Sequence, residues 1–247
     1  ATATVVRLVV DFERGSLGVV ITMTTDGALT GIQLTAPEAA APLAPWQPPE
    51  YADPTLFVEQ DVRVGDGALA VPGTLSIPNG MGPWPAVVLL AGSGPQDRDE
   101  TLGRNKPLKD VAWGLASRSI AVLRFDKVTF AHQDALRDRA DFTLTDEYLP
   151  DAAGAVRLVL DHEQIDSSCI ILAGHSLGGT VIPRIITALA DVAAAVILAG
   201  GTVPMHRASL RQVRYLASSN PDQARAAAAM IDAPGRPRQR HDSGLRR

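Results

Sequence analysis

A repeated alternation of apolar and helix-like segments most constrains the fold of this chain. Continuous apolar patterns typical of strands occur at 85–92, 120–127, 169–176 and 194–201, and helix-like segments separate them. Strands that alternate with helices form βαβ units, and strands that are apolar throughout are buried on both faces. The sequence therefore predicts an α/β fold, with a mostly parallel sheet and helices on both of its faces.

The helix-like segments cover 108–118, 146–163 and 177–190, and two more follow at about 205–218 and 221–232. Thr143 and Asp146 have the spacing of a capping box in front of the helix at 146–163. This spacing predicts that the helix begins directly after Thr143.

The first part of the chain has a β pattern instead. Residues 4–12, 17–25 and 29–34 are rich in Val, Ile and Thr, which predicts a small β-meander. Residues 36–54 are rich in Pro and Ala without a period, as in a linker or a strap over the surface. Residues 55–78 predict a hairpin or a β-meander around Asp66 and Gly67. The predicted organisation is 1–35 β-rich, 36–54 linker, 55–232 α/β domain and 233–247 basic, disordered tail.

Composition excludes several classes of function. The formal net charge of −4 gives no reason to expect nucleic acid as a partner. No apolar run reaches the length of a membrane span, and the alternating first segment is not a signal peptide. Cys169, the single cysteine, cannot form an internal disulfide. The compartment stays open between the cytoplasm and export.

The stretch Gly174-His175-Ser176-Leu177-Gly178 is a G-x-S-x-G between a predicted strand and a predicted helix. This is the setting of a nucleophile elbow, in which a strained turn exposes the serine hydroxyl. Side chains at 174 and 178 would collide with neighbouring backbone, and the helix N-terminus would direct N–H groups, beginning near Leu177, at developing negative charge. Ser176 is therefore the candidate nucleophile. The alternative is a glycine-rich turn with a capping serine.

The loop at 89–100 follows the strand at 85–92, where an enzyme of this architecture places its second oxyanion N–H. Pro95 has no N–H, which leaves Ser93 or Gly94 as the donor. The alternative is an ordinary Gly/Pro loop that carries surface charges.

Four stretches together resemble bacterial α/β-hydrolases of the esterase and acyl-hydrolase type: 91–107, 114–127, 142–159 and 172–185. The resemblance covers about residues 55–202 and implies an α/β-hydrolase fold, an acylated serine and a small-molecule acyl substrate. The chemistry that it implies requires no metal or organic cofactor. Residues 1–35 are similar to the end of a small accessory domain that precedes some such hydrolases.

A serine nucleophile also needs a histidine base and a carboxylate, which in this family follow the serine in the order acid, then histidine. After Gly201 the sequence shows only helices and a tail, without the two strands that would carry them. Asp232 and His241 have the correct order, but a tail cannot position them well. We therefore expect an α/β-hydrolase domain that is truncated at its C-terminus and lacks the catalytic acid and base. Its activity is expected to be impaired. The basic tail is expected not to be native sequence of this family.

Other polar residues have structural interpretations. His175 is expected to pack in the turn, and three more histidines are expected to be solvated: His132, His162 and His206. The run Asp97, Arg98 and Asp99 lines the mouth of a site or forms its own ion pairs. Asp126 and Lys127 lie at the carboxyl end of a strand, where open α/β sheets bind ligands. A salt bridge to the neighbouring loop is the expected role, with ligand binding as the alternative. Cys169 and Trp113 are expected in the core.

Two other functions stay open. One is a non-catalytic binding module of the same fold, and the other is a peptidase or thioesterase. If the sheet ends at 194–201, that strand also exposes an edge through which the chain self-associates.

Overall fold

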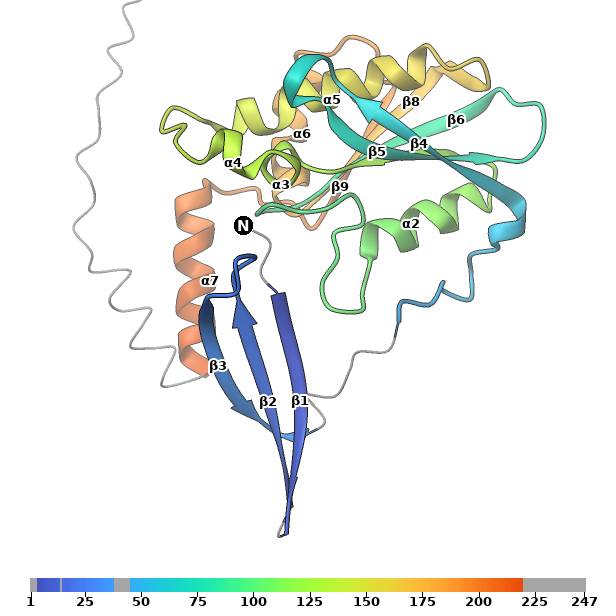
Figure 1. Cartoon of the computed structure of the whole chain (residues 1–247). Helices are drawn as coiled ribbons and strands as arrows, with labels where there is room; N and C mark the ends of the chain where they lie inside the picture. Colours follow the sequence, from blue (N-terminus) through green and yellow to red (C-terminus); the bar gives the residue numbers. More distant parts are fainter. Residues whose placement is uncertain (1–3, 14, 38–44, 220–247) are drawn as a thin grey trace, which may run out of the picture. The chain divides into compact units, whose positions relative to one another are not determined.

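The computed structural model describes residues 4–13, 15–37 and 45–219 (Figure 1). By its internal contacts the chain divides into two compact units, residues 1–200 and 201–247. The first unit contains two β-sheets, and the second contains helix α7 (Met205–Ser219).

The predicted β-meander is confirmed. Strands β1 (Thr4–Phe12), β2 (Gly15–Met23) and β3 (Leu29–Thr35) form an antiparallel sheet in that order. In the turn between β2 and β3, the Thr24 N–H donates to the Ala28 carbonyl over 2.8 Å. Short antiparallel strands joined by tight turns need no contact from a distant part of the chain to form, which explains why the sequence alone predicts them.

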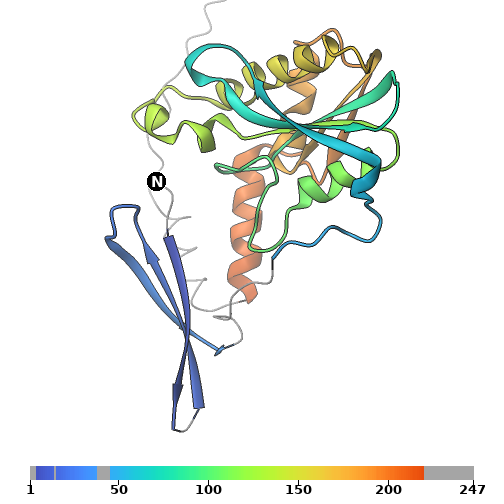
Figure 2. The ribbon, with the colours of Figure 1, turned by 45° about the vertical axis from the view of Figure 1, so that its right-hand side comes forward.

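The second sheet has six strands in the order β4-β5-β7-β6-β8-β9. Its strands lie among the helices of the α/β part in both views (Figure 1, Figure 2). The predicted hairpin is present as β4 (Phe57–Val64) and β5 (Val71–Pro78), and β5 pairs antiparallel with β7 (Ala121–Phe125). The other strands are parallel: β6 (Trp84–Leu90) lies between β7 and β8 (Ile165–His175), and β9 (Ala194–Leu198) pairs with β8.

Helices cover both faces of this sheet, as predicted. Val87 and Leu89 of β6 pack in a cluster with Leu108 and Ala112 of α2 (Pro107–Ala116). The intervening residues Val88 and Leu90 belong to the other cluster, with α5 (Leu144–Leu160) and α6 (Leu177–Ile186). Successive side chains of a strand point to opposite faces, so this division places α2 on one face and α5 with α6 on the other. The architecture is the α/β-hydrolase fold that the resemblance implied.

The capping box of α5 is confirmed. The Thr143 side chain accepts from the Asp146 N–H, and the Asp146 carboxylate accepts from the Thr143 N–H over 2.8 Å. Two short helices that the sequence did not predict, α3 (Val128–Ala131) and α4 (Gln133–Leu136), lie between β7 and α5.

The described part of 36–54 is a strap along α2. The Asp53 N–H donates to Ser117 Oγ over 2.8 Å, and Arg118 Nη1 donates to the Tyr51 carbonyl over 2.9 Å. A Cβ at Gly114 would lie 2.7 Å from the Tyr51 ring, so the absence of a side chain there lets the strap approach the helix.

The sequence predicted that the last parallel strand, at 194–201, is buried, and this prediction is wrong. All five residues of β9 are exposed, and β9 is an edge strand that pairs only with β8 among the described residues. The predicted helix at 205–218 corresponds to α7, and the one at 221–232 lies outside the described residues. Within the described residues, no helix is both long and apolar enough to cross a membrane.

Candidate active site

Ser176 lies in a sharp turn between the end of β8 and the start of α6. Its backbone has φ 51° and ψ −115°, a conformation that a residue with a side chain rarely adopts. The turn is held by the Ser176 N–H, which donates to the Leu198 carbonyl over 2.8 Å, and by the Thr180 N–H, which donates to the Ser176 carbonyl over 2.9 Å. The Ser176 side chain makes no capping hydrogen bond to α6. Such strain at a helix N-terminus is typical of functional sites.

The two glycines of the G-x-S-x-G allow this turn to pack tightly. A Cβ at Gly174 would lie 2.5 Å from the carbonyl carbon of Gly178, and a Cβ at Gly178 would lie 2.5 Å from the carbonyl oxygen of Leu90. Neither distance is tolerable for a real side chain. The backbone at both positions therefore agrees with the turn that the sequence predicts.

The loop after β6 lies beside this turn. A Cβ at Gly92 would be 3.2 Å from the Cβ of Ser176, so the two segments are in contact. Ser93 and Gly94 follow on the exposed part of the loop. Within the described part of the chain, the backbone N–H groups of Leu177, Ser93 and Gly94 donate to no protein acceptor.

Glu100 connects the loop to the turn, a role that sequence reasoning missed. Its buried carboxylate accepts the Gly92 N–H over 2.8 Å through Oε1. His175 Nδ1 lies 3.0 Å from Oε1 and 2.9 Å from Oε2 of the same carboxylate. The imidazole is thus engaged in the turn, as the sequence analysis expected of His175. The one local signal for Glu100 was its place in the charged run that follows the loop.

A second buried group holds the loop from behind. Lys127, whose side chain is 3% exposed, donates to the Gly92 carbonyl over 2.9 Å and to the Tyr148 hydroxyl over 3.0 Å. Its third partner is Glu147 Oε1 at 2.9 Å, which also accepts from Thr129 over 2.8 Å. Burial lowers the pKa of Lys127 below its ordinary value, although Glu147 acts in the opposite direction. Burial raises the pKa of Tyr148, with the charge of Glu147 adding to the effect.

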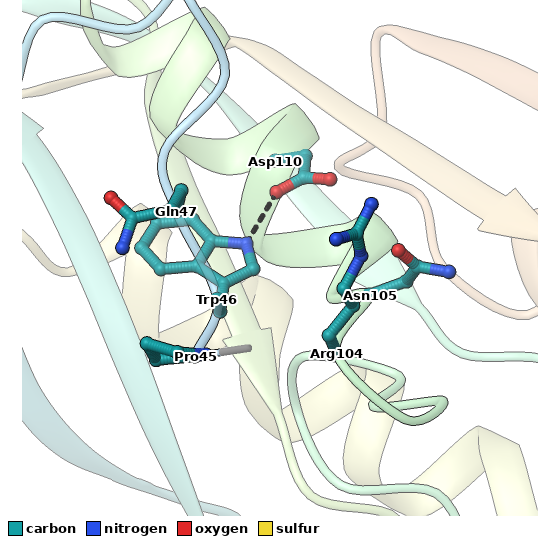
Figure 3. A pocket seen from close by; sticks show the side chains of 6 residues that line it. All are labelled: Pro45, Trp46, Gln47, Arg104, Asn105 and Asp110. Atoms are coloured by element: carbon teal, nitrogen blue, oxygen red, sulfur yellow. Dashed lines mark hydrogen bonds between the residues drawn. The ribbon is translucent and has the colours of Figure 1, made fainter. Parts of the chain in front are cut away.

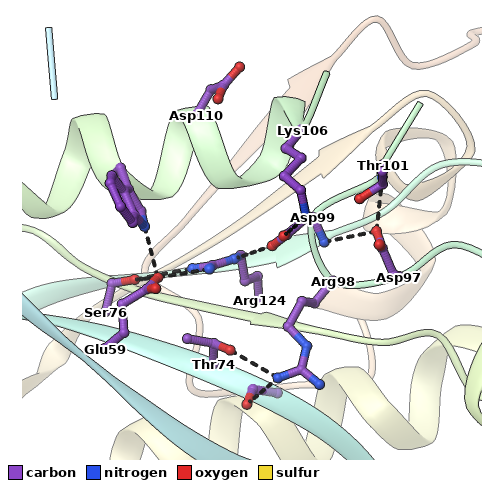
Figure 4. A network of polar contacts seen from close by, with 12 residues as sticks. Glu59, Thr74, Ser76, Asp97, Arg98, Asp99, Thr101, Lys106, Asp110 and Arg124 are labelled. Atoms are coloured by element: carbon purple, nitrogen blue, oxygen red, sulfur yellow. Dashed lines mark hydrogen bonds and ion pairs between the residues drawn. The ribbon is translucent and has the colours of Figure 1, made fainter. Parts of the chain in front are cut away.

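The charged run 97–99 makes its own ion pairs, one of the two alternatives left open. Arg98 Nε lies 3.0 Å from Asp126 Oδ1. Arg98 Nη1 donates to Thr74 Oγ1 over 2.9 Å (Figure 4). The predicted salt bridge from Asp126 to the neighbouring loop is therefore confirmed. Asp97 accepts the Thr101 N–H over 2.8 Å, which closes the turn of the loop.

Asp99 is the centre of a second set of ion pairs. It contacts Lys106 over 2.7 Å and Arg124 over 2.8 Å, and Arg124 reaches Glu59 over 2.7 Å (Figure 4). Although burial acts to raise it, the hydrogen bonds from Lys106 and Arg124 hold the pKa of Asp99 below its ordinary value. This network joins β4, β7 and the loop before α2, so it fixes the loop on the sheet.

The remaining candidate acids and bases do not contact Ser176 among the described residues. His132 Nε2 lies 3.0 Å from the Ala70 carbonyl, and His162 Nδ1 lies 3.2 Å from the Gln164 N–H. His206 belongs to α7, and Asp232 and His241 lie outside the described residues. Within the described ranges, no group of His, Cys, Asp and Glu is placed to hold a metal ion.

A pocket of about 250 Å³ lies where the strap meets the loop before α2 (Figure 3). Trp46 Nε1 donates to Asp110 over 2.8 Å, and the Lys109 ammonium lies 4.6 Å from the centre of the Trp46 ring. Arg104 and Asn105 line the opposite side (Figure 3). The volume is below the usual range for a ligand site.

Two expectations about the core are corrected. Trp113 is half-buried, because it packs edge-to-face on Trp46 of the strap and donates to Glu59 over 2.9 Å. Cys169 is also half-buried, since it lies in the part of β8 that precedes the buried segment.

The chain is similar to esterase EstD of Thermotoga maritima, with 37% identity over 210 residues, which are 84% of this chain and 47% of that protein. The chain thus spans about half the length of the esterase that it matches. No known family model matches it. Among solved structures, esterase Est22 gives a TM-score of 0.49 at 18% identity, over 63% of this chain and 48% of Est22. The 2,6-dihydroxy-pseudo-oxynicotine hydrolase gives a TM-score of 0.42 at 20% identity, over 54% of this chain and 34% of the hydrolase.

Proposed function

We propose that this homologue of a bacterial esterase is a serine hydrolase that cleaves carboxylic esters through an acyl-enzyme on Ser176. The observation that carries the proposal is the backbone of Ser176, which has φ 51° directly between β8 and the N-terminus of α6. That geometry exposes a hydroxyl where helix N–H groups converge, as nucleophilic acyl transfer requires. The similarity to an esterase supports the substrate class.

In the proposed reaction, Ser176 Oγ forms a bond to the ester carbonyl carbon, and the carbonyl electron pair moves onto oxygen. The Leu177 N–H and the N–H of Ser93 or Gly94 donate to this oxyanion, since none of the three has a protein acceptor among the described residues. Collapse of the intermediate breaks the bond to the alcohol, which leaves with a proton. Water then hydrolyses the acyl-enzyme and restores the serine.

The proton of Ser176 needs a base, and the base and its acid partner stay predictions. Asp232 and His241 have the order that the fold requires along the chain, but both lie outside the described residues. No described histidine other than His175 contacts the turn, and the Nδ1 of His175 is engaged by Glu100. We therefore propose that this chain by itself acylates slowly.

A fluorophosphonate probe tests the nucleophile. The unaltered chain is expected to gain the mass of one phosphonyl group, located on Ser176 by peptide mapping, and Ser176→Ala is expected to gain none. Ser168→Ala, which removes an exposed hydroxyl from the same strand, is the matched control and should label like the unaltered chain. Labelling elsewhere, or none, would refute Ser176 as the nucleophile.

Among the described residues no histidine hydrogen-bonds to the Ser176 hydroxyl, and His175 pairs with Glu100 instead. This favours one second candidate, a non-catalytic binding module. Hydrolysis of p-nitrophenyl acetate separates the two. Turnover that disappears in Ser176→Ala would exclude the binding module, whereas a rate equal to that of buffer in both proteins would favour it. A parallel assay with a thioester and a peptide substrate distinguishes esterase from thioesterase and peptidase.

A further inference from the structure

We propose that Lys127 and Tyr148 are positioning residues that orient and polarise the peptide between Gly92 and Ser93, and thereby select the Ser93 N–H as the oxyanion donor of the loop. The inference rests on the proposed function, because it concerns the same site. It also decides between the two donors, Ser93 and Gly94, that the sequence left open.

The Gly92 carbonyl is held by two buried donors. Lys127 Nζ and the Tyr148 hydroxyl each lie 2.9 Å from its oxygen. The single hydrogen of the Tyr148 hydroxyl is shared with the Ala91 carbonyl, whose oxygen lies 3.0 Å away. The three ammonium hydrogens of Lys127 have three acceptors: this carbonyl, the Tyr148 hydroxyl and Glu147. On the other side, the Gly92 N–H donates to Glu100 over 2.8 Å. Both backbone polar groups of Gly92 are therefore fixed by buried side chains.

The orientation of the Ser93 N–H follows from the planarity of the peptide. The Gly92 carbonyl and the Ser93 N–H belong to one trans peptide group, in which they point in opposite directions. The Ser93 N–H thus points away from Lys127 and Tyr148. A cation that hydrogen-bonds to the carbonyl also draws electron density from the amide nitrogen, which makes the N–H a stronger donor.

The corresponding support for Gly94 is weaker. Its N–H shares a peptide with the Ser93 carbonyl, whose one donor among the described residues is the neutral side chain of Gln96, over 3.0 Å. Ser93 and Gly94 are both exposed, but both residues joined by the Gly94 peptide are exposed, whereas the Ser93 peptide begins at Gly92. Gly92, by contrast, is buried and so close to the turn that a Cβ there would be 3.2 Å from the Cβ of Ser176. An oxyanion donor must be fixed before the reaction, so Ser93 is the better-prepared donor.

The test uses two variants of the full chain. Tyr148→Phe removes one donor to Gly92 and keeps the ring. Lys127→Met combined with Glu147→Gln removes the ammonium together with its carboxylate partner. No unpaired buried charge remains, so the double variant is expected to fold. The matched control, Ser117→Ala, removes a hydroxyl that hydrogen-bonds to the carbonyls of Asp53 and Trp113, outside this cluster.

The first readout is the saturable reaction with a fluorophosphonate. Tyr148→Phe is expected to lower the maximal labelling rate by on the order of tenfold, and the double variant by more. Deleting an oxyanion donor lowers the rate by ~10²–10³-fold, and a donor that is only displaced should cause part of that loss. The half-saturating probe concentration should stay the same, since the oxyanion forms only in the transition state. Ser117→Ala should label like the unaltered chain.

The second readout does not depend on catalysis. In amide NMR spectra, the Ser93 proton is expected to shift upfield in both variants, as in a less polarised N–H, while that of Gly94 changes little. Unchanged labelling rates in variants that still label on Ser176 would overturn the positioning role and leave the nucleophile intact. An unlabelled but folded parent chain would overturn the proposed function and, with it, this role.

Discussion

Asp151 is a buried carboxyl of α5 that lies outside the candidate site. It is 6% exposed, and its Oδ2 has no hydrogen-bond partner among the described residues. Burial raises its pKa to about 7, and the nearby His132 and the Val128 backbone only partly oppose this. Between pH 4 and pH 7 the folded state therefore holds a proton that the unfolded state has released. Protein stability must fall as the pH rises through this window.

The variant Asp151→Asn tests this effect, because the amide cannot ionise. We expect its free energy of unfolding to exceed that of the unaltered chain by about 1–3 kcal/mol at pH 8, the usual cost of an unsatisfied buried polar group. At pH 4 the two proteins should be closely similar. Urea unfolding at both pH values measures the difference, and Asp138→Asn, at an exposed position, is the control. A variant that unfolds in parallel with the parent at both pH values would contradict the prediction.

The candidate site shows which residues a sequence can reveal. Ser176, Gly174 and Gly178 were predicted because they are neighbours in sequence and their spacing alone describes the turn. Glu100, Lys127 and Tyr148 were not assigned to the site, because they meet at Gly92 from three separate segments. Their convergence depends on the pairing of β6 with both β7 and β8, which no local pattern contains.

At the scale of elements, the start of α5 is defined by its capping box. Thr143 and Asp146 satisfy each other's backbone N–H groups, and the hydrogen bonds from Thr143 lower the pKa of Asp146 below its ordinary value of 3.8. A carboxylate whose pKa is lowered by folding stabilises the protein above that ordinary value. This stabilisation is lost as the pH falls through the lower pKa of the folded state.

We expect Thr143→Ala to lower the free energy of unfolding by about 1 kcal/mol at pH 7. The loss should be smaller at pH 2, because the capping box weakens as the pH falls through the lowered pKa of Asp146. Chemical unfolding followed by circular dichroism at the two pH values measures both changes. Thr145→Ala, at an exposed position in the same helical turn, should be neutral or slightly stabilising because alanine favours helix. An equal loss of stability in Thr145→Ala would contradict the assignment to the cap.

Most elements could be predicted because their patterns are local. Continuous apolar residues define the strands at 85–92 and 120–127. A capping box defines the start of the helix after Thr143. The order of the six strands could not be predicted, since β5 reaches β7 past the intervening β6 in the chain. The short α3 and α4 span four residues each, too few for a helical period to be visible.

At the scale of the whole molecule, the two edges of the large sheet differ in chemistry. The edge strand β4 carries Glu59, Asp61 and Arg63, charges that discourage pairing with another chain. The other edge, β9, has the sequence Ala-Ala-Val-Ile-Leu and is exposed along its length. Val196 and Ile197 are 43% and 51% exposed. An uncharged, exposed edge strand is a template for strand addition, so we expect the chain to self-associate through β9.

Val196→Lys tests this expectation by placing a charge on the β9 edge. The unaltered chain should show a concentration-dependent mass above that of the monomer in light scattering, and Val196→Lys should move the distribution toward monomer. Val58→Lys introduces the same charge at an exposed position of the opposite edge strand, and it should associate like the parent. If the unaltered chain is monomeric at high concentration, or if both lysine variants dissociate equally, then β9 is not the associating edge. Ile197 is unsuitable for the test because it packs against Gly179 at the start of α6, where a lysine would also disturb the turn at Ser176.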